Sequence, residues 1–306
     1  MASDVVLFID ANQYLKLYGM VAGKQVLNWL EEQQAHIFVS AQIVDEVARN
    51  KLDCAQRFLL DKLKLDVVVP DHLLGIAGEK INELRQNIRK SANELNTLAD
   101  DVLCKISRSE DDVSQRLSAL FDKANSPLPD QMERARDRKE RGNPPGKQDD
   151  PLGDQITWEQ LLTYSKGIKN LWIITDDRDY GIKHEKRMLL NSLLRRDLMI
   201  TCGIELQVHY YNNWSEGMTE FRKNVGVTTD KLPTPSDIEE IKEEEETLPP
   251  TRPRDRVFTA SDATFAAYRQ MQRRRGRASF DAPGVQHPSV QHPSVLDNNP
   301  ATESKA

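Results

Sequence analysis

Short apolar segments recur along the first two thirds of the chain, separated by stretches with helical spacing. Residues 5–9 are five apolar residues in a row, and residues 36–40, 65–69, 171–175 and 206–211 are mostly apolar. Such runs are typical of strands buried on both faces of a parallel sheet. Between these runs, apolar residues recur with helical spacing at 14–32, after Ser40, at 155–166 and at 184–198. Gly19 and Gly23 are potential breaks in the first of these helices. Strands and helices are therefore expected to alternate. The pattern therefore predicts an α/β fold with a parallel sheet.

A long amphipathic stretch interrupts this alternation. Between residues 78 and 121, apolar residues recur at steps of three, four and seven, which predicts one or two long helices. The near-heptad spacing would suit a coiled coil, but Ser91 and Lys105 interrupt its seam. We therefore expect this stretch to pack on the chain's own core. Its repeating apolar positions are Ile81, Leu84, Ile88, Leu95, Leu98 and Val102.

Residues 125–150 are polar and rich in proline and glycine, which predicts a connecting loop. With the long helices, this loop forms a helical insertion at about residues 75–150. A basic cluster in it is a candidate for contacts with a phosphate backbone, since such contacts give affinity without reading sequence. The cluster consists of Arg134, Arg136, Arg138, Lys139 and Arg141.

Beyond about residue 229 the apolar pattern fades. An acidic run at 239–246, several prolines and a repeated segment at 285–294 predict a disordered tail, because these residues bury too little apolar surface to offset ordering entropy. We place a folded domain at 1–228 and the tail at 229–306. Residues 260–277 end in a basic run that would suit RNA, DNA or a protein partner, although a solvated charge cluster is the simpler interpretation.

Composition narrows the function classes only modestly. The chain has 306 residues, 38% of them hydrophobic, a length that suits one or two domains. Its net charge of -6 gives no indication of nucleic-acid binding. Its three cysteines, Cys54, Cys104 and Cys202, are scattered and form no CxxC pair, so reduced cytosolic thiols are the plain interpretation. No apolar run approaches the roughly 18 residues of a membrane span. We expect a cytoplasmic protein with no membrane partner.

Four acidic residues stand where a parallel sheet would bring them to one edge. Asp10 ends the first strand, Glu46 lies in the first turns of the helix after the second strand, and Asp154 begins the helix before a late strand. Asp177 follows that late strand. Ligands of such folds collect at the carboxyl ends of the strands. Clustered carboxylates repel one another, and the usual remedy is a divalent cation, here Mg²⁺ or Mn²⁺.

Each acid taken singly has an ordinary structural interpretation. Asp10 and Asp154 are suitable helix caps, Glu46 is suitable as a solvated helix acid, and Asp176, Asp177 and Asp179 are typical of a turn. Only their joint order supports a metal site. A cation at such a site activates water and neutralises charge on a scissile phosphate, so the pattern favours phosphodiester hydrolysis.

The ordered motifs resemble those of the PIN domain. They are Asp-x-Asn after the first strand, Glu in the second helix, Gly-Asp before a Trp-containing helix, and Thr-x-Asp after a late strand. The similarity is greatest to the PIN-like group with a long helical insertion, whose Gly-Asn-Pro-Pro-Gly loop precedes Gly-Asp-x-x-x-Trp. Residues 142–146 and 153–158 carry these two motifs here. The resemblance covers roughly residues 3–215.

This resemblance implies a three-layer α/β/α fold and a metal-dependent nuclease, most often an endoribonuclease. It implies that Asp10, Glu46, Asp154 and Asp177 are the catalytic, metal-binding acids. It assigns auxiliary roles to Asn12, Thr175 and Asp179, while Asp176 is an extra acid in this register. RNA is the expected partner, with a protein partner possible through the tail.

Two other functions compete with the nuclease. A PIN-like scaffold that binds protein or nucleic acid without cutting would be expected to lack one or more acids, and all four are present here. A phosphatase of the haloacid dehalogenase type also begins with a strand that ends in Asp. That chemistry needs a second Asp two residues later as general acid, where this chain has Asn12.

Overall fold

The computed structural model describes residues 4–62, 78–146, 151–185, 187–225 and 232–248. The chain divides into a compact unit, Met1–Arg252, and a second unit, Pro253–Ala306. The second unit, with its predicted basic segment, lies outside the described residues. The strand predicted at 65–69 also lies outside them.

The central element is a four-stranded parallel sheet in the order β2-β1-β3-β6. The strands are β1 (Val5–Ile9), β2 (Ile37–Phe38), β3 (Asn170–Ile174) and β6 (Gln207–Tyr211). In the register of β1 and β3, Val5 lies opposite Asn170 and Ile9 opposite Ile174. The two strands therefore end at the same level. The predicted α/β fold with a parallel sheet is confirmed.

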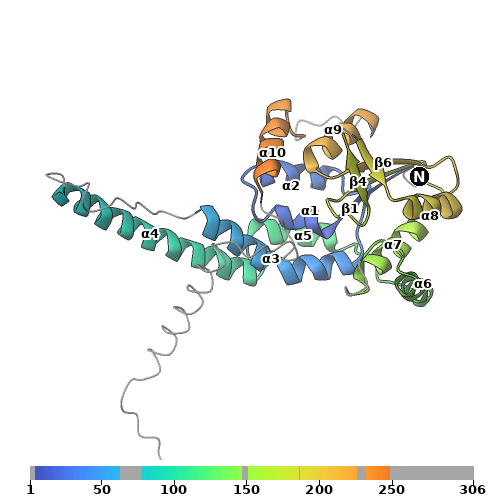
Figure 1. Cartoon of the computed structure of the whole chain (residues 1–306), viewed down its shortest axis with the longest axis horizontal. Helices are drawn as coiled ribbons and strands as arrows, with labels where there is room; N and C mark the ends of the chain where they lie inside the picture. The colour runs from blue at the N-terminus through green and yellow to red at the C-terminus, as the bar shows by residue number, and fades with distance from the viewer. Residues whose placement is uncertain (1–3, 63–77, 147–150, 186, 226–231, 249–306) are drawn as a thin grey trace, which may run out of the picture. The chain divides into compact units, whose positions relative to one another are not determined.

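The apolar strands place the core around β1 and β3, flanked by helices (Figure 1). Residues 7–9 and 171–174 are almost completely buried, as continuous apolar strands require. Aromatic side chains fill the space between the sheet and the helices. Trp29, Trp158, Trp172 and Trp214 are all fully buried. The surrounding helices include α1 (Ala11–Lys16), α2 (Gly23–Glu32), α3 (Ala41–Lys62), α5 (Asp112–Phe121), α7 (Gly153–Tyr164), α8 (Ser192–Cys202) and α9 (Trp214–Val225).

The stretch predicted as a helix at 14–32 contains a break between α1 and α2. Gly19 lies in the break, and a Cβ there would lie 3.3 Å from a ring carbon of Phe58 in α3. A residue without a side chain thus lets the connection pass close to α3. Helix α1 is therefore short. It ends at Lys16, and Asp10 is the residue that caps its start.

The helix predicted at 184–198 is wrong in its first half. The chain forms an antiparallel hairpin, β4 (Gly181–His184) and β5 (Arg187–Leu190), before α8. A Cβ at Gly181 would lie 2.2 Å from the carbonyl oxygen of Leu189, so the pairing needs glycine there. The Asn191 side chain caps α8 by accepting from the Leu193 amide at 2.9 Å. The spacing of leucines across both elements is compatible with a helix, which explains the error.

The connection predicted at 125–150 also contains regular structure. Helix α6 (Pro129–Glu140) begins with a proline at its first position, where the missing amide costs least, and the Leu128 amide donates to the Gln131 side chain. Helix α6 packs on α7. The loop prediction therefore holds at 125–128 and at 141–146, where Gly142 and Gly146 have φ of 65° and 89°. Residues 147–150 lie outside the described residues.

The long helical stretch is confirmed as α4 (Gly78–Ser107) followed by α5. Its predicted packing is wrong for much of α4. Ile106 is buried at its end, but the side chains of Leu84, Leu98 and Val102 are 52%, 60% and 43% exposed. An apolar stripe on α4 thus faces solvent.

The tail predicted from residue 229 is wrong for residues 235–247, which form helix α10 (Pro235–Thr247). Thr234 caps this helix through the Asp237 amide, and the helix packs against α9. Ile241 is completely buried, while most of the acidic residues face solvent or contact helix ends. The packed part of the chain therefore extends past the predicted boundary at 228.

Candidate active site

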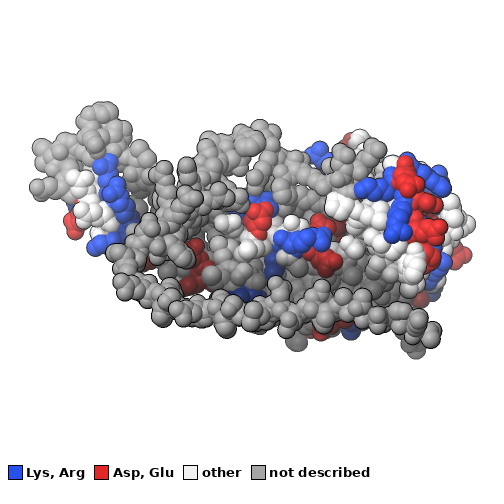
Figure 2. Space-filling model, turned by 90° about the horizontal axis from the view of Figure 1, so that it is seen from below, with Lys and Arg blue, Asp and Glu red and all other residues white. Residues whose placement is uncertain are grey.

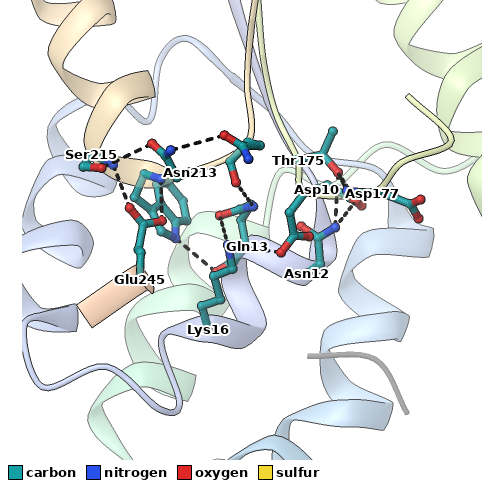
Figure 3. A network of polar contacts seen from close by, with 12 residues as sticks. Asp10, Asn12, Gln13, Lys16, Thr175, Asp177, Asn213, Ser215 and Glu245 are labelled. Atoms are coloured by element: carbon teal, nitrogen blue, oxygen red, sulfur yellow. Dashed lines mark hydrogen bonds and ion pairs between the residues drawn. The ribbon is translucent and has the colours of Figure 1, made fainter. Parts of the chain in front are cut away.

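Asp10 lies at the junction between β1 and α1. Its side chain is 4% exposed, and its Oδ1 accepts a hydrogen bond from the Ala11 amide at 2.8 Å. Its Oδ2 accepts from the Thr175 hydroxyl at 2.6 Å and from the Asn12 amide nitrogen at 2.7 Å (Figure 3). The carboxylate therefore caps α1 and is also held by polar groups from α1 and from the end of β3.

Asn12 and Thr175 complete this buried unit. Both are buried, and the Asn12 Nδ2 also donates to the Thr175 hydroxyl oxygen at 3.1 Å. The Oδ1 of Asn12 is buried and has no hydrogen-bond partner within the described part of the chain. A buried acceptor without a donor is unusual. The unit thus presents an unused oxygen ligand next to a carboxylate.

Asp177 is tied to the same unit through the turn after β3. Its amide donates to the Thr175 hydroxyl oxygen at 3.0 Å, and its Oδ1 accepts from the Asp179 amide at 3.0 Å. Asp176 instead forms an ion pair with Lys16, at 3.2 Å between Nζ and Oδ2. The Thr-x-Asp spacing therefore brings Asp177, and not Asp176, to the hydroxyl that also contacts Asp10.

Two buried tyrosines report the negative charge at this edge. Burial raises the pKa of Tyr210, and Asp177, Asp10 and Asp176 raise it further. Burial also raises the pKa of Tyr14, with Asp10 adding to the effect. Several carboxylates therefore act on the same small region between β3, β6 and α1. Such a region favours the approach of a cation.

Glu46 and Asp154 belong to two neighbouring helices beside this unit. Glu46 lies in the second turn of α3, and Asp154 is the second residue of α7. The starts of the two helices are joined by the hydroxyl groups of Ser40 and Thr157, 2.8 Å apart. A Cβ at Gly153 would lie 3.5 Å from Oε1 of Gln42, which is one helical turn before Glu46.

The four predicted acids do not form a complete set of metal ligands among the described residues. Among the residues that the structure describes, no group of three or more histidines, cysteines or acids is arranged to hold a metal ion. Mg²⁺, however, is commonly held by only one or two carboxylates, together with water and substrate phosphate. The Asp10 carboxylate and the unused oxygen of the neighbouring Asn12 are donors of that kind, and Asp177 follows in the turn after β3. The residues present therefore fit a divalent cation of this type.

The Gly-Asn-Pro-Pro-Gly loop lies against the start of α7. A Cβ at Gly146 would approach the Gln155 side chain to 2.4 Å, and Gln155 is itself buried beside Asp154 in sequence. The Arg138 guanidinium donates to the Pro144 carbonyl at 2.8 Å and so anchors the loop to α6. The two motifs at 142–146 and 153–158 are therefore in contact.

Two residues of the predicted basic cluster have internal partners. Arg138 donates to Oε1 of Glu159 at 2.8 and 2.9 Å, and Arg134 donates to Oε2 at 2.9 Å. Glu159 is 5% exposed, and Arg138 also lies 2.7 Å from Asp197 of α8. These contacts hold α6 to α7 and α8. Arg136 and Arg141 are exposed. Contact between the cluster and nucleic acid stays a prediction.

The face drawn in Figure 2 carries Lys and Arg side chains interspersed with Asp and Glu. No unbroken basic surface is visible among the described residues on this face. Glu159 is the partner that sequence reasoning missed. Its one signal was an acid directly after Trp158, on a helix that also carries Leu161 and Leu162.

A second polar network, also missed from the sequence, runs from Lys16 towards Glu245 of α10 (Figure 3). Lys16 donates to the Gln13 side chain at 3.2 Å, and the Gln13 carbonyl accepts from the Trp214 indole at 3.2 Å. The carboxylate of Glu245 accepts from the amides of Trp214 and Ser215 at 2.6 and 3.1 Å. Helix α10 therefore caps the start of α9.

Comparisons with known proteins do not assign the chain to a family. No family model, curated protein or solved structure matches the chain. None of the helices within the described ranges is long and apolar enough to cross a membrane. The function must therefore be argued from the site itself.

Proposed function

We propose that this chain is a metal-dependent nuclease that hydrolyses phosphodiester bonds at the edge formed by β1 and β3. One observation carries the proposal. Asp10 and Asp177 follow two adjacent parallel strands, and the Thr175 hydroxyl donates to the Asp10 carboxylate and accepts from the backbone amide of Asp177. Ligand sites of parallel sheets form at this end of the strands. The motif order that resembles the PIN domain supports the same function.

The residues of this edge have distinct roles in the proposal. Asp10 and Asp177, with Asn12, would hold a Mg²⁺ or Mn²⁺ ion, with Glu46 and Asp154 on the side of α3 and α7. When bound, the ion would supply an activated water and neutralise charge on the scissile phosphate. Thr175 and Asn12 fix the rotamer of Asp10 by their hydrogen bonds. Such pre-orientation lowers the cost of assembling the reactive geometry.

RNA is the proposed substrate class, on the strength of the PIN-like motif order. Exposed Arg136 and Arg141 on the α6 side of the loop are the members of the basic cluster best placed to meet a phosphate backbone. Arg134 and Arg138 contribute by holding that side in place. Phosphate contacts of this kind would bind many sequences and weaken as salt rises.

A non-catalytic scaffold is the second candidate. It is favoured by the lack of a group of three metal-binding acids among the described residues. A scaffold would bind RNA or a protein without consuming it. The two functions therefore differ in whether the bound polymer is cut.

The test is cleavage of fluorescently labelled single- and double-stranded RNA and DNA by the full chain. Reactions contain Mg²⁺, Mn²⁺ or a chelator. We expect cleavage with a divalent ion, none with chelator, and none by Asp10→Asn. Asp137→Asn, an exposed acid on α6, is the matched control and should cut normally. Binding without cleavage by well-folded wild-type protein would favour the scaffold.

A further inference from the structure

The apolar stripe of α4 has the pattern of a coiled-coil seam. Residues 81–106 span between three and four heptads, the length at which sustained pairing becomes stable. In heptad positions a and d stand Ile81, Leu84, Ile88, Leu95, Leu98 and Val102, with Ser91 and Lys105 at the remaining two. Three of these apolar residues are more than 40% exposed in the folded chain. Within the described part of the chain, the helix therefore presents Leu84, Leu98 and Val102 of this seam to solvent.

Charge divides α4 into two opposite halves. Residues 80–92 contain four basic residues and one acid, a net charge of +3. Residues 93–106 contain three acids and one lysine, a net charge of -2. The basic residues are Lys80, Arg85, Arg89 and Lys90, and the acids of the second half are Glu94, Asp100 and Asp101. In Figure 2, Lys and Arg side chains gather at the end of the molecule where α4 lies.

We propose that α4 pairs with α4 of a second copy of this chain, in antiparallel orientation, with the two-fold axis near residue 93. In that register Leu84 meets Val102 of the partner copy, and Ile88 meets Leu98, as a and d positions require. Each basic half then lies beside an acidic half. Arg85 comes level with Asp101 of the partner copy, while Lys105, at a d position of the seam, faces Ile81. Charges that flank the seam set partner and orientation in coiled coils.

The charge pattern also disfavours the other occupants of this face. A parallel pair would place both basic halves together and both acidic halves together, which like charges disfavour. A nucleic acid laid along the helix would meet three acids in the second half, so only part of its length would be attracted. At 1.5 Å per residue, α4 is about 45 Å long and offers a seam long enough for a specific interface. A second copy is the occupant that complements the whole helix.

The oligomeric state of the full chain tests the proposal. Light scattering after size-exclusion chromatography measures the molar mass of the full chain. At protein concentrations of about 1 to 100 µM, a range that covers typical dimer affinities, the mass should be twice the 34.9 kDa of one chain. Leu98→Asp should raise the dissociation constant about tenfold or more, because a charge would be buried in the seam. Ile204→Asp, which alters an 82% exposed residue outside α4, is the control and should leave the dimer intact. Circular dichroism confirms that both variants fold.

Orientation is tested by crosslinking. In a Cys104→Ser background, Leu84→Cys with Val102→Cys should form an intermolecular disulfide, whereas Leu84→Cys alone should not. Within one chain the two positions are about 27 Å apart along the helix, too far for a disulfide. A monomeric wild type, a dimer that Leu98→Asp leaves unchanged, or crosslinking by Leu84→Cys alone would each overturn the proposal. A monomer whose RNA binding falls in Arg89→Glu/Lys90→Glu would assign α4 to nucleic acid instead.

Discussion

Two buried acids in this chain are compensated in opposite ways. Asp10 accepts its hydrogen bonds from a hydroxyl, a side-chain amide and a backbone amide, and other carboxylates lie close by. Glu159 accepts from two guanidinium groups. Neutral donors orient an acid, whereas arginines also offset its charge. Glu159 therefore serves the packing of α6 on α7, while the bonds to Asp10 fix its orientation at the end of β1.

The largest effect on stability should come from breaking the arginine pairs of Glu159. Arg138→Met leaves a carboxylate that is 6% exposed with one partner fewer and releases Asp197 as well. Removing one partner of a buried ion pair typically costs ~3–5 kcal/mol. Urea unfolding should show this loss, with Arg136→Met as the exposed control that changes stability little. A stable Arg138→Met protein would show that the network is not structural.

The corresponding change at Asp10 should damage activity and spare stability. Asp10→Asn removes one charge from a cluster of acids, which weakens metal binding and relieves repulsion. Because the amide group can keep only some of the bonds to Ala11, Asn12 and Thr175, we expect a change in unfolding free energy within about 1 kcal/mol. Cleavage should be abolished. Full cleavage by the folded variant would remove Asp10 from the site.

The three acids after β3 should rank by their partners. Asp177→Ala should cost most activity, because it removes a carboxylate that acts together with Asp10 on Tyr210 at this edge. Asp179→Ala should have an intermediate effect, since Asp179 lies in the turn that holds the Asp177 carboxylate. Asp176→Ala should cost least, because its side chain pairs with Lys16. Cleavage rates at saturating Mn²⁺, with a metal titration, separate weak binding from lost chemistry. An inactive Asp176→Ala with an active Asp177→Ala would reverse the assignment.

Glu245 extends the comparison to a buried acid held mainly by backbone amides. Burial raises its pKa above the usual 4.5, and Lys16 and the amides of Trp214 and Ser215 oppose that rise. A raised pKa in the folded state means that its contribution to stability is fully present below pH 4.5 and is lost as pH rises through the folded pKa. The melting temperature of the wild type, measured relative to that of Glu245→Gln, should therefore fall as the pH rises from 4.5 to 7. A constant difference across this range would contradict the burial effect.

The strand end that carries Asp10 was predictable from the sequence for a physical reason. Val5–Ile9 and the residues before Thr175 are continuous apolar runs, which only a buried strand accommodates, and parallel strands share one edge. Once the two strand ends are placed, the positions of Asp10, Asn12, Thr175 and Asp177 relative to those ends follow from the sequence. Their proximity is the part of the candidate site that local patterns could supply.

Other features depend on distant partners and gave no such signal. The pairing of Arg134 and Arg138 with Glu159 joins residues more than 20 positions apart, so the sequence showed only a basic cluster. Helix α10 buries Ile241 among acids that face outward, and composition alone suggested disorder. The hairpin at β4 and β5 depends on close contact at Gly181. In each case tertiary contacts decided the outcome.

Binding of Mn²⁺ tests the central claim most directly, because it reports on ion binding at Asp10 without requiring a substrate. Titration followed by electron paramagnetic resonance of free Mn²⁺ should show binding by wild-type protein and by the Asp137→Asn control. Asp10→Asn should bind at least about tenfold more weakly, which corresponds to ~1.4 kcal/mol. Equal binding by Asp10→Asn and wild type, or no binding by wild type, would contradict a metal site at the ends of β1 and β3.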